Sequence, residues 1–195
     1  EKVSTETLRD SMERIQAIAL VHDFLTKDAD VRVADIQGIV EKLVRHPTMG
    51  VSRMQDVAGC RAELTNLDAV DLGRRRIEQA GWSIADEDDY NADPKTTGYR
   101  AVHLVVIRDA TPVEIQLRTT WQQAWAAAVE RLDLRYSLAL KDGHGPEPLA
   151  RFMERVAYAR DLQGRGTALG PGLRDELAKL AAEAEKWLSN RRSTR

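Results

Sequence analysis

The spacing of apolar residues predicts helices in the first quarter of the chain and again toward its end. Apolar positions that recur every three or four residues lie on one face of a helix, and such stripes are typical of helices that cover a core. Before residue 47 the pattern predicts two helices, at 4–27 and about 33–46. Further along it predicts four more, at about 68–80, 119–135, 149–162 and 172–190.

The middle of the chain has the alternating and β-branched patterns of strands. Strands are expected at 57–64, from 82 into the acidic stretch 86–89, at 101–108 and at 112–118. Loops are expected at 91–98 and 142–148, where glycine and proline gather. Helices, then strands with a crossover helix, then helices predict an α/β (α+β) fold with a mixed β-sheet. We expect an N-terminal helix at 1–30, a core at 31–140 and C-terminal helices at 141–195.

Bulk composition excludes several classes of protein. The 195 residues are 43% hydrophobic and 31% charged, which is typical of a globular chain. Cys60 is the only cysteine, so a disulfide framework and a cysteine-based metal site are excluded. The net charge of −2 gives no general attraction to nucleic acid, and no apolar run approaches the roughly 20 residues that span a bilayer. We therefore expect a cytoplasmic protein with no membrane partner.

Two carboxylates interrupt segments that otherwise look like core. Glu114, Gln116 and Arg118 alternate with apolar residues, so all three are expected on one face of their strand. Asp56 stands at the entry to the strand at 57–64. If the two strands lie side by side, Asp56 and Glu114 converge and could hold Mg²⁺, which prefers oxygen ligands. The alternative is an exposed sheet face with ordinary ion pairs.

The segment 93–103 combines a loop with the start of a strand. Gly98 permits a turn that other residues resist, and Tyr99, Ala101 and His103 would share a face of the strand that follows. An aromatic ring, a small residue and an imidazole side by side could seat a purine base, and Lys95 could reach its phosphates. Alternatively, Tyr99 is a half-buried strand tyrosine and His103 a structural histidine.

The helix expected at 33–46 has a small, cationic face. Ala34, Gly38 and Lys42 are four residues apart and so share that face, with Arg32 just before the helix. The surface could admit a triphosphate, or it could be an ordinary solvent face.

Three blocks of this sequence together resemble the synthetase domain of RelA/SpoT proteins. They are residues 56–61 (DVAGCR), 94–103 (PKTTGYRAVH) and 113–119 (VEIQLRT), in the family's order and at suitable spacing. The likeness covers about residues 25–135. It implies a nucleotidyltransferase-like synthetase core and an ATP-dependent transfer of pyrophosphate to the 3′-hydroxyl of GDP or GTP, giving (p)ppGpp, or of an adenine nucleotide.

The resemblance also implies roles for individual residues. Asp56 and Glu114 would hold Mg²⁺, and Glu114 would help to deprotonate the attacking hydroxyl. Arg32 and Arg61 would sandwich the adenine of ATP, and Lys42 would contact its phosphates. Tyr99 would stack on the acceptor base, and the residues around the acceptor nucleotide would be Lys95, His103 and Gln116.

The sequence departs from the family pattern on the ATP side. Ala34 and Gly38 stand where lysine and serine are usual, and Thr97 where asparagine is common. Two alternatives therefore stay open: a toxin that pyrophosphorylates the 3′ end of tRNA, with an antitoxin partner, and a non-catalytic regulator. The pair His22 and Asp23 is expected to be structural, so hydrolysis of the alarmone is not expected. The C-terminal helices could pack within the chain or form a homo-oligomer.

Overall fold

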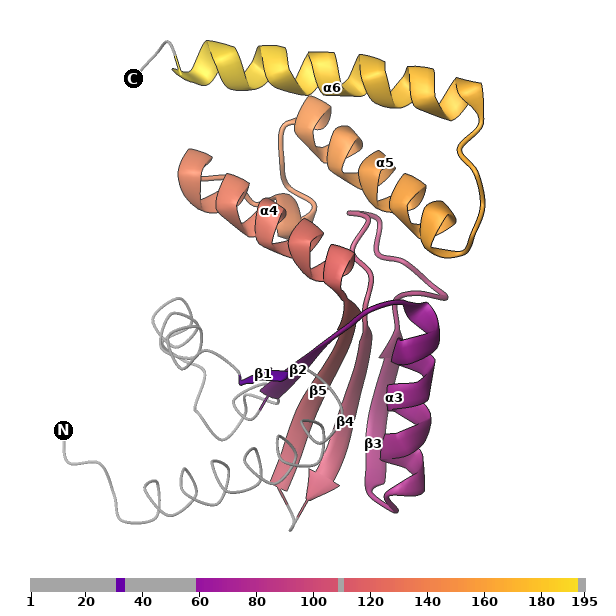
Figure 1. Ribbon diagram of the computed structural model, residues 1–195. Coiled ribbons are helices and arrows are strands. Elements are labelled where there is room, and N and C mark those ends of the chain that lie inside the picture. The colour runs from indigo at the N-terminus through magenta and orange to yellow at the C-terminus, as the bar shows by residue number, and fades with distance from the viewer. Residues whose placement is uncertain (1–30, 34–58, 109–110, 193–195) are drawn as a thin grey trace, which may run out of the picture. The chain divides into compact units, whose positions relative to one another are not determined.

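The structure is a computed structural model that describes residues 31–33, 59–108 and 111–192 (Figure 1). These fall into two compact units. The first unit holds the described residues up to Asp88 together with those from Val102 to Arg118, and the second holds residues 89–101 and 119–192. Each unit is described by itself. The helices predicted before residue 47 lie almost wholly outside the described residues, as do Asp56 and Lys42.

The first unit is built on a five-stranded sheet in the order β1-β2-β5-β4-β3. The strands are β1 (Val31–Val33), β2 (Gly59–Leu64), β3 (Ser83–Asp89), β4 (Val102–Arg108) and β5 (Thr111–Thr119). β4 and β5 are antiparallel, with Leu104 opposite Ile115, and β1 pairs antiparallel with β2. The centre of the sheet is therefore β5, the strand that carries Glu114.

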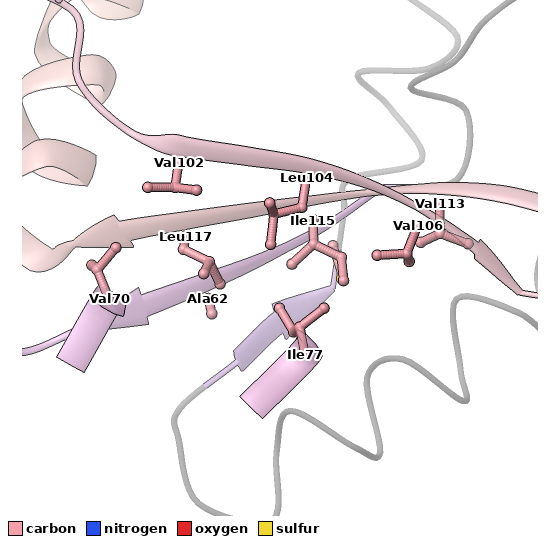
Figure 2. Packing of buried hydrophobic residues seen from close by; sticks show 10 residues of the cluster. Ala62, Val70, Ile77, Val102, Leu104, Val106, Val113, Ile115 and Leu117 are labelled. Carbon is pink, nitrogen blue, oxygen red and sulfur yellow. The ribbon is translucent and has the colours of Figure 1, made fainter. Parts of the chain in front are cut away.

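One face of this sheet packs against α3 (Leu67–Gln79). The helix begins at an asparagine cap, where the side chain of Asn66 accepts from the backbone N–H of Ala69 at 2.8 Å. Val70 and Ile77 are seven residues apart, so they lie on the same side of the helix, and both are buried. Figure 2 shows them directed toward the strand residues of the core, which include Ala62, Leu104, Ile115 and Leu117.

The second unit is helical, with a long loop at 89–101. It contains α4 (Thr120–Tyr136), the short 3₁₀ helix η2 (Leu140–Asp142), α5 (Glu147–Gly164) and α6 (Pro171–Arg192). Thr119 and Gln122 form a capping box at the start of α4. Trp125, Leu149 and Met153 are buried in its core, with Trp121 packed against them.

The strands and helices predicted from the sequence agree closely with those described. The α+β class is confirmed, and the predicted helices at 68–80, 119–135, 149–162 and 172–190 correspond to α3, α4, α5 and α6. Several boundaries were wrong. Val33, expected to begin a helix, ends the short strand β1. The strands expected from residues 82 and 101 begin one residue later, at Ser83 and Val102, and the strand expected at 112–118 spans Thr111–Thr119. In the described part of the chain, none of the helices is both long enough and apolar enough to cross a bilayer.

The two C-terminal helices pack side by side (Figure 1). Leu180 and Ala184 of α6 are buried, and Arg155 of α5 donates from Nε to Oε1 of Glu176 at 3.0 Å. Part of the predicted apolar stripe of α6 is thus used within the chain. A homo-oligomer formed through these helices stays a prediction.

Candidate functional site

The face of the sheet opposite α3 carries a row of polar side chains on β5. Val113, Ile115 and Leu117 are fully buried in the core, whereas Glu114 and Gln116 are half-buried. This alternation confirms the predicted division of the strand into a core face and a polar face. A half-buried polar row at the centre of a sheet differs from a fully solvated face, because its charges are partly shielded from water.

Glu114 is paired with His103 of the neighbouring strand. The Nδ1 atom of His103 lies 2.8 Å from Oε1 of Glu114, and the two side chains are 18% and 16% exposed. In the register of β4 and β5, His103 is opposite Gln116 and Val105 is opposite Glu114, so the pair is a diagonal contact. The carboxylate accepts a hydrogen bond from Nδ1, so Nδ1 carries a proton.

Gln116 links two guanidinium groups on the same face. Its Oε1 atom accepts from Arg118 at 2.9 Å and, in a longer contact, from Nε of Arg61 on β2 at 3.4 Å. Arg118 is 5% exposed. Predicted site residues from three strands, Arg61, His103, Glu114 and Gln116, are thus brought together in one unit. Their charges could bind phosphates and move a proton.

The carboxylate of Glu114 also acts through the sheet on Cys60. Burial, and to a smaller degree the negative charge of Glu114, raise the pKa of the Cys60 thiol to about 12. The thiol is therefore neutral near pH 7 and a poor nucleophile.

The loop at 89–101, in the second unit, carries Lys95 and Tyr99. Asp89 begins it by accepting from the backbone N–H groups of Asn91 and Ala92. Gly98 has a φ of +90°, and a Cβ atom there would lie 2.9 Å from Cα of Glu154 in α5. Only glycine fits that conformation and that approach, so the predicted role of Gly98 in a turn is confirmed.

Lys95 and Tyr99 lie beside each other. The Nζ atom of Lys95 is 5.4 Å from the centroid of the Tyr99 ring, within the range of a cation–π contact. A second tyrosine, Tyr90, contacts both residues. Neither the pattern of the sequence nor the resemblance assigned it. The sequence contains one indication of a binding role for Tyr90, its position next to the predicted loop. Tyrosine side chains, which are partly apolar and partly polar, are common at binding sites on loops.

A buried ion pair supports the end of this loop. Arg100 is 7% exposed, and its Nε lies 3.6 Å from Oδ1 of Asp161 in α5. A second nitrogen of Arg100 donates to the carbonyl of Gly98 at 3.2 Å, and Arg165 donates to Oδ2 of Asp161 at 3.0 Å. Burial lowers the pKa of the Arg100 guanidinium from its usual value, and the charge of Asp161 opposes that shift. Sequence reasoning missed this pair because its members are 61 positions apart.

Other predicted site residues are placed only in part. Asp56 and Lys42 lie outside the described residues, as do Ala34 and Gly38. The backbone of Arg32 is the direct register partner of Arg61. Tyr99 and Ala101 precede β4, so strand alternation does not align them with His103, contrary to expectation.

Among the residues that the structure describes, no group of three or more His, Cys, Asp or Glu side chains could hold a metal ion.

A cavity of about 410 Å³ lies in the second unit, but it is not lined by the predicted site residues. Its lining includes Thr97 of the loop and Trp125, Leu140 and Met153 of the core. The side chains that carry predicted chemistry are instead on the polar face of the sheet and around Lys95.

A sheet covered by a helix on one face and lined with polar groups on the other, together with helices after it, defines an α+β protein with the fold of small alarmone synthetases. Small alarmone synthetase 1 from Bacillus subtilis superposes with a TM-score of 0.62 at 23% identity, covering 94% of this chain and 100% of that one. The same enzyme bound to its product pppGpp gives a TM-score of 0.60 at 24% identity, with coverages of 84% and 95%. At this identity the likeness establishes the fold.

The chain belongs to the RelA/SpoT family. The model of that family, described as the region found in RelA and SpoT proteins, matches residues 31–139, more than half of the chain. A model described as histidine kinase matches residues 1–48, about a quarter of the chain, and shows no second family.

Relatives of known sequence agree with this membership. The GTP pyrophosphokinase YjbM of Bacillus subtilis is 30% identical over 139 residues, which are 66% of this chain and 64% of the relative. An uncharacterized protein of Mycobacterium tuberculosis, Rv1366, is 34% identical over 151 residues, 76% of this chain and 52% of that protein. The chain thus spans between about half and about two thirds of the length of these relatives.

Proposed function

We propose that this chain is a nucleotide pyrophosphokinase that transfers the β,γ-pyrophosphoryl group of ATP to the 3′-hydroxyl of GDP or GTP. The observation that carries the proposal is the pairing of Glu114 with His103 on a polar sheet face, in a chain of the RelA/SpoT family. The match to YjbM, a GTP pyrophosphokinase, and the fold shared with a synthetase bound to pppGpp support a guanine nucleotide as acceptor.

The reaction needs a base and an arrangement of charges. The 3′-oxygen of the acceptor forms a bond to the β-phosphorus of ATP, and the bond from that phosphorus to the oxygen bridging it to the α-phosphate breaks. AMP leaves with the bonding electrons, and the hydroxyl proton passes to the carboxylate of Glu114. His103, hydrogen-bonded to that carboxylate, orients it. Most of the rate enhancement in such transfers comes from positioning and charge stabilisation, which fixed cations supply.

The donor set on the polar face fits Mg²⁺ in its chemistry. Glu114 presents a half-buried carboxylate, and carboxylate oxygens together with substrate phosphates are the usual ligands of this ion. Asp56 would be the second protein ligand. When bound, Mg²⁺ neutralises charge on the phosphates.

The two nucleotides would use different groups of residues. For ATP, Arg61 on β2 and its register partner Arg32 on β1 support the proposed adenine sandwich, with Lys42 at the phosphates. For the acceptor, the ring of Tyr99 with the ammonium of Lys95 beside it supports stacking on the base and contact with a phosphate. The family resemblance assigns His103 and Gln116 to the acceptor nucleotide as well.

A transfer assay tests the proposal directly. The purified chain is incubated with Mg²⁺ and ATP labelled in its γ-phosphate, in separate reactions with GDP, GTP, unlabelled ATP and tRNA. We expect label in a 3′-pyrophosphorylated guanine nucleotide, resolved by anion-exchange chromatography. If only ATP or only tRNA gained a labelled 3′-pyrophosphate, that molecule would be the acceptor instead of a guanine nucleotide. If none of the four acceptors gained label, only a non-catalytic binding role would remain.

A further inference from the structure

A second tyrosine closes the loop that carries Lys95 and Tyr99. The rings of Tyr90 and Tyr99 have centroids 5.6 Å apart and an interplanar angle of 69°, an edge-to-face arrangement that aromatic pairs prefer. The backbone N–H of Tyr90 donates to the carbonyl of Ala101 at 2.9 Å. The residue therefore joins the beginning of the loop to its end.

Tyr90 also lies nearer than Tyr99 to the ammonium of Lys95. The Nζ atom is 4.6 Å from the Tyr90 centroid and 5.4 Å from that of Tyr99. Lys95 is exposed, and an exposed lysine normally samples many rotamers. A cation that already rests over two rings has fewer rotamers to lose when an anion binds, so the same contact gives a higher affinity.

Backbone hydrogen bonds keep the rest of the loop in register with these rings. The N–H of Gly98 donates to the carbonyl of Lys95 at 2.8 Å, and the N–H of Lys95 donates to the carbonyl of Tyr99 at 3.3 Å. Asn91, next to Tyr90, accepts through its side chain from Gln122 of α4 at 2.7 Å. The three side chains thus share a loop with a defined shape.

We propose that Tyr90 is a positioning residue of the acceptor site, which sets the spacing between the stacking ring of Tyr99 and the cation of Lys95. That spacing suits a nucleotide whose base stacks on the ring while a phosphate meets the ammonium. This inference rests on the proposed function, because it assigns the loop to the acceptor nucleotide.

Kinetics with Tyr90→Leu and Tyr90→Phe test it. Tyr90→Leu removes the π face and should raise the KM for the acceptor about tenfold, equivalent to about 1.4 kcal/mol, with kcat and the KM for ATP nearly unchanged. Tyr90→Phe keeps the ring and should behave as wild type. The matched control is Tyr136→Leu, because Tyr136 makes the same kinds of contact elsewhere in the second unit, edge-to-face with Trp187 and under Arg135.

A double-mutant cycle with Lys95→Met separates positioning from general loss of structure. If Tyr90 acts by placing the ammonium, Tyr90→Leu should weaken acceptor binding much less in the Lys95→Met background than in wild type. Additive losses, or equal losses in Tyr90→Phe and Tyr90→Leu, would overturn the inference.

Calorimetry of GTP binding without ATP separates this inference from the proposed function. If wild type binds GTP but transfers nothing, the proposed function fails and the binding cycle alone decides the role of Tyr90. If wild type transfers pyrophosphate and Tyr90→Leu binds the acceptor as tightly as wild type does, the proposed function stands and the inference fails. Absence of both GTP binding and transfer overturns both.

Discussion

His103 and Glu114 form a 2.8 Å contact between Nδ1 and Oε1 across two antiparallel strands. Both side chains project from the face of the sheet that α3 does not cover. The contact fixes the orientation of a half-buried carboxylate. A carboxylate oriented in this way can act as a base on a nearby hydroxyl. The chemistry proposed for this chain therefore depends first on this pair.

Glu114→Gln should abolish transfer without unfolding the protein. Glutamine keeps an oxygen that can accept from His103, so the sheet should be retained, but it can neither take a proton nor neutralise a cation. We expect kcat to fall by at least about 100-fold, the lower range for loss of a general base. Steady-state assays with ATP and GTP measure the fall, and thermal melting checks that Tm stays close to that of wild type.

Glu63→Gln is the matched control for that substitution. Glu63 is half-buried on β2 and alternates with the buried residues Cys60 and Ala62, as Glu114 alternates with core residues on β5. The change in charge is the same, so we expect kcat within about threefold of wild type, a difference of less than about 0.7 kcal/mol. Equal losses in the two variants would show that net charge, not the position of Glu114, governs the rate.

The roles of His103 and Glu114 should be coupled rather than independent. If His103 acts by orienting the carboxylate, His103→Ala should lower kcat in wild type but have little further effect in Glu114→Gln. Residues that act as a unit give such non-additive losses. The four kcat values form the cycle, and His144→Ala, at an exposed histidine whose Nδ1 contacts the backbone carbonyl of Asp142, should leave them unchanged. Fully additive losses would contradict the orienting role.

Much of the fold follows from local patterns in the sequence. Alternation fixed the faces of β5, and the apolar stripe of α3 is reflected in the burial of Val70 and Ile77. The short strand β1 was missed because three residues are too few to show a period. The start of β4 was set one residue early because Ala101 continues the apolar pattern of the strand, although its backbone lies outside the strand.

The candidate site could be predicted only where chemistry showed in single residues. Glu114 and Gln116 stood out as polar positions in an apolar strand, and Lys95 beside a turn glycine stood out as a loop cation. The contact of His103 with Glu114 could not be predicted, because it depends on the register of β4 against β5. The pairing of Arg100 with Asp161 depends on how α5 packs against the loop, which no local pattern encodes.

Cys60 should be unreactive in the folded protein and should make stability fall at alkaline pH. Its pKa is raised to about 12 in the fold, above the value in an unfolded chain. The contribution of Cys60 to stability is therefore fully present below the unfolded pKa of about 8.5, where the thiol is protonated in both states. As pH rises from there toward 12, only the unfolded state gives up the proton, so this contribution is lost. Across that window the slope for one proton is about 1.4 kcal/mol per pH unit.

Thiol titration and alkaline denaturation measure these two effects. A disulfide reagent at pH 8 should label Cys60 only after guanidinium is added, since the side chain is 2% exposed. In urea titrations between pH 8.5 and 11, Cys60→Ala should show a shallower loss of stability than wild type, although it starts lower because a buried group has been removed. Rapid native labelling, or equal slopes in the two proteins, would contradict the assignment.

Asp161→Ala should destabilise the loop that carries Lys95 and Tyr99. It leaves the buried guanidinium of Arg100 without its counter-ion, and breaking a buried pair in this way costs about 3 kcal/mol or more. At about 2–4 °C per kcal/mol for a chain of this size, Tm should fall by roughly 6–12 °C. Asp142→Ala, which removes an exposed carboxylate from η2 in the same unit, should leave Tm nearly unchanged.

Because the loop is proposed to hold the acceptor, the KM for GTP should rise in Asp161→Ala at temperatures below its Tm. An acceptor KM equal to that of wild type would separate the ion pair from the site and leave it a role in stability alone.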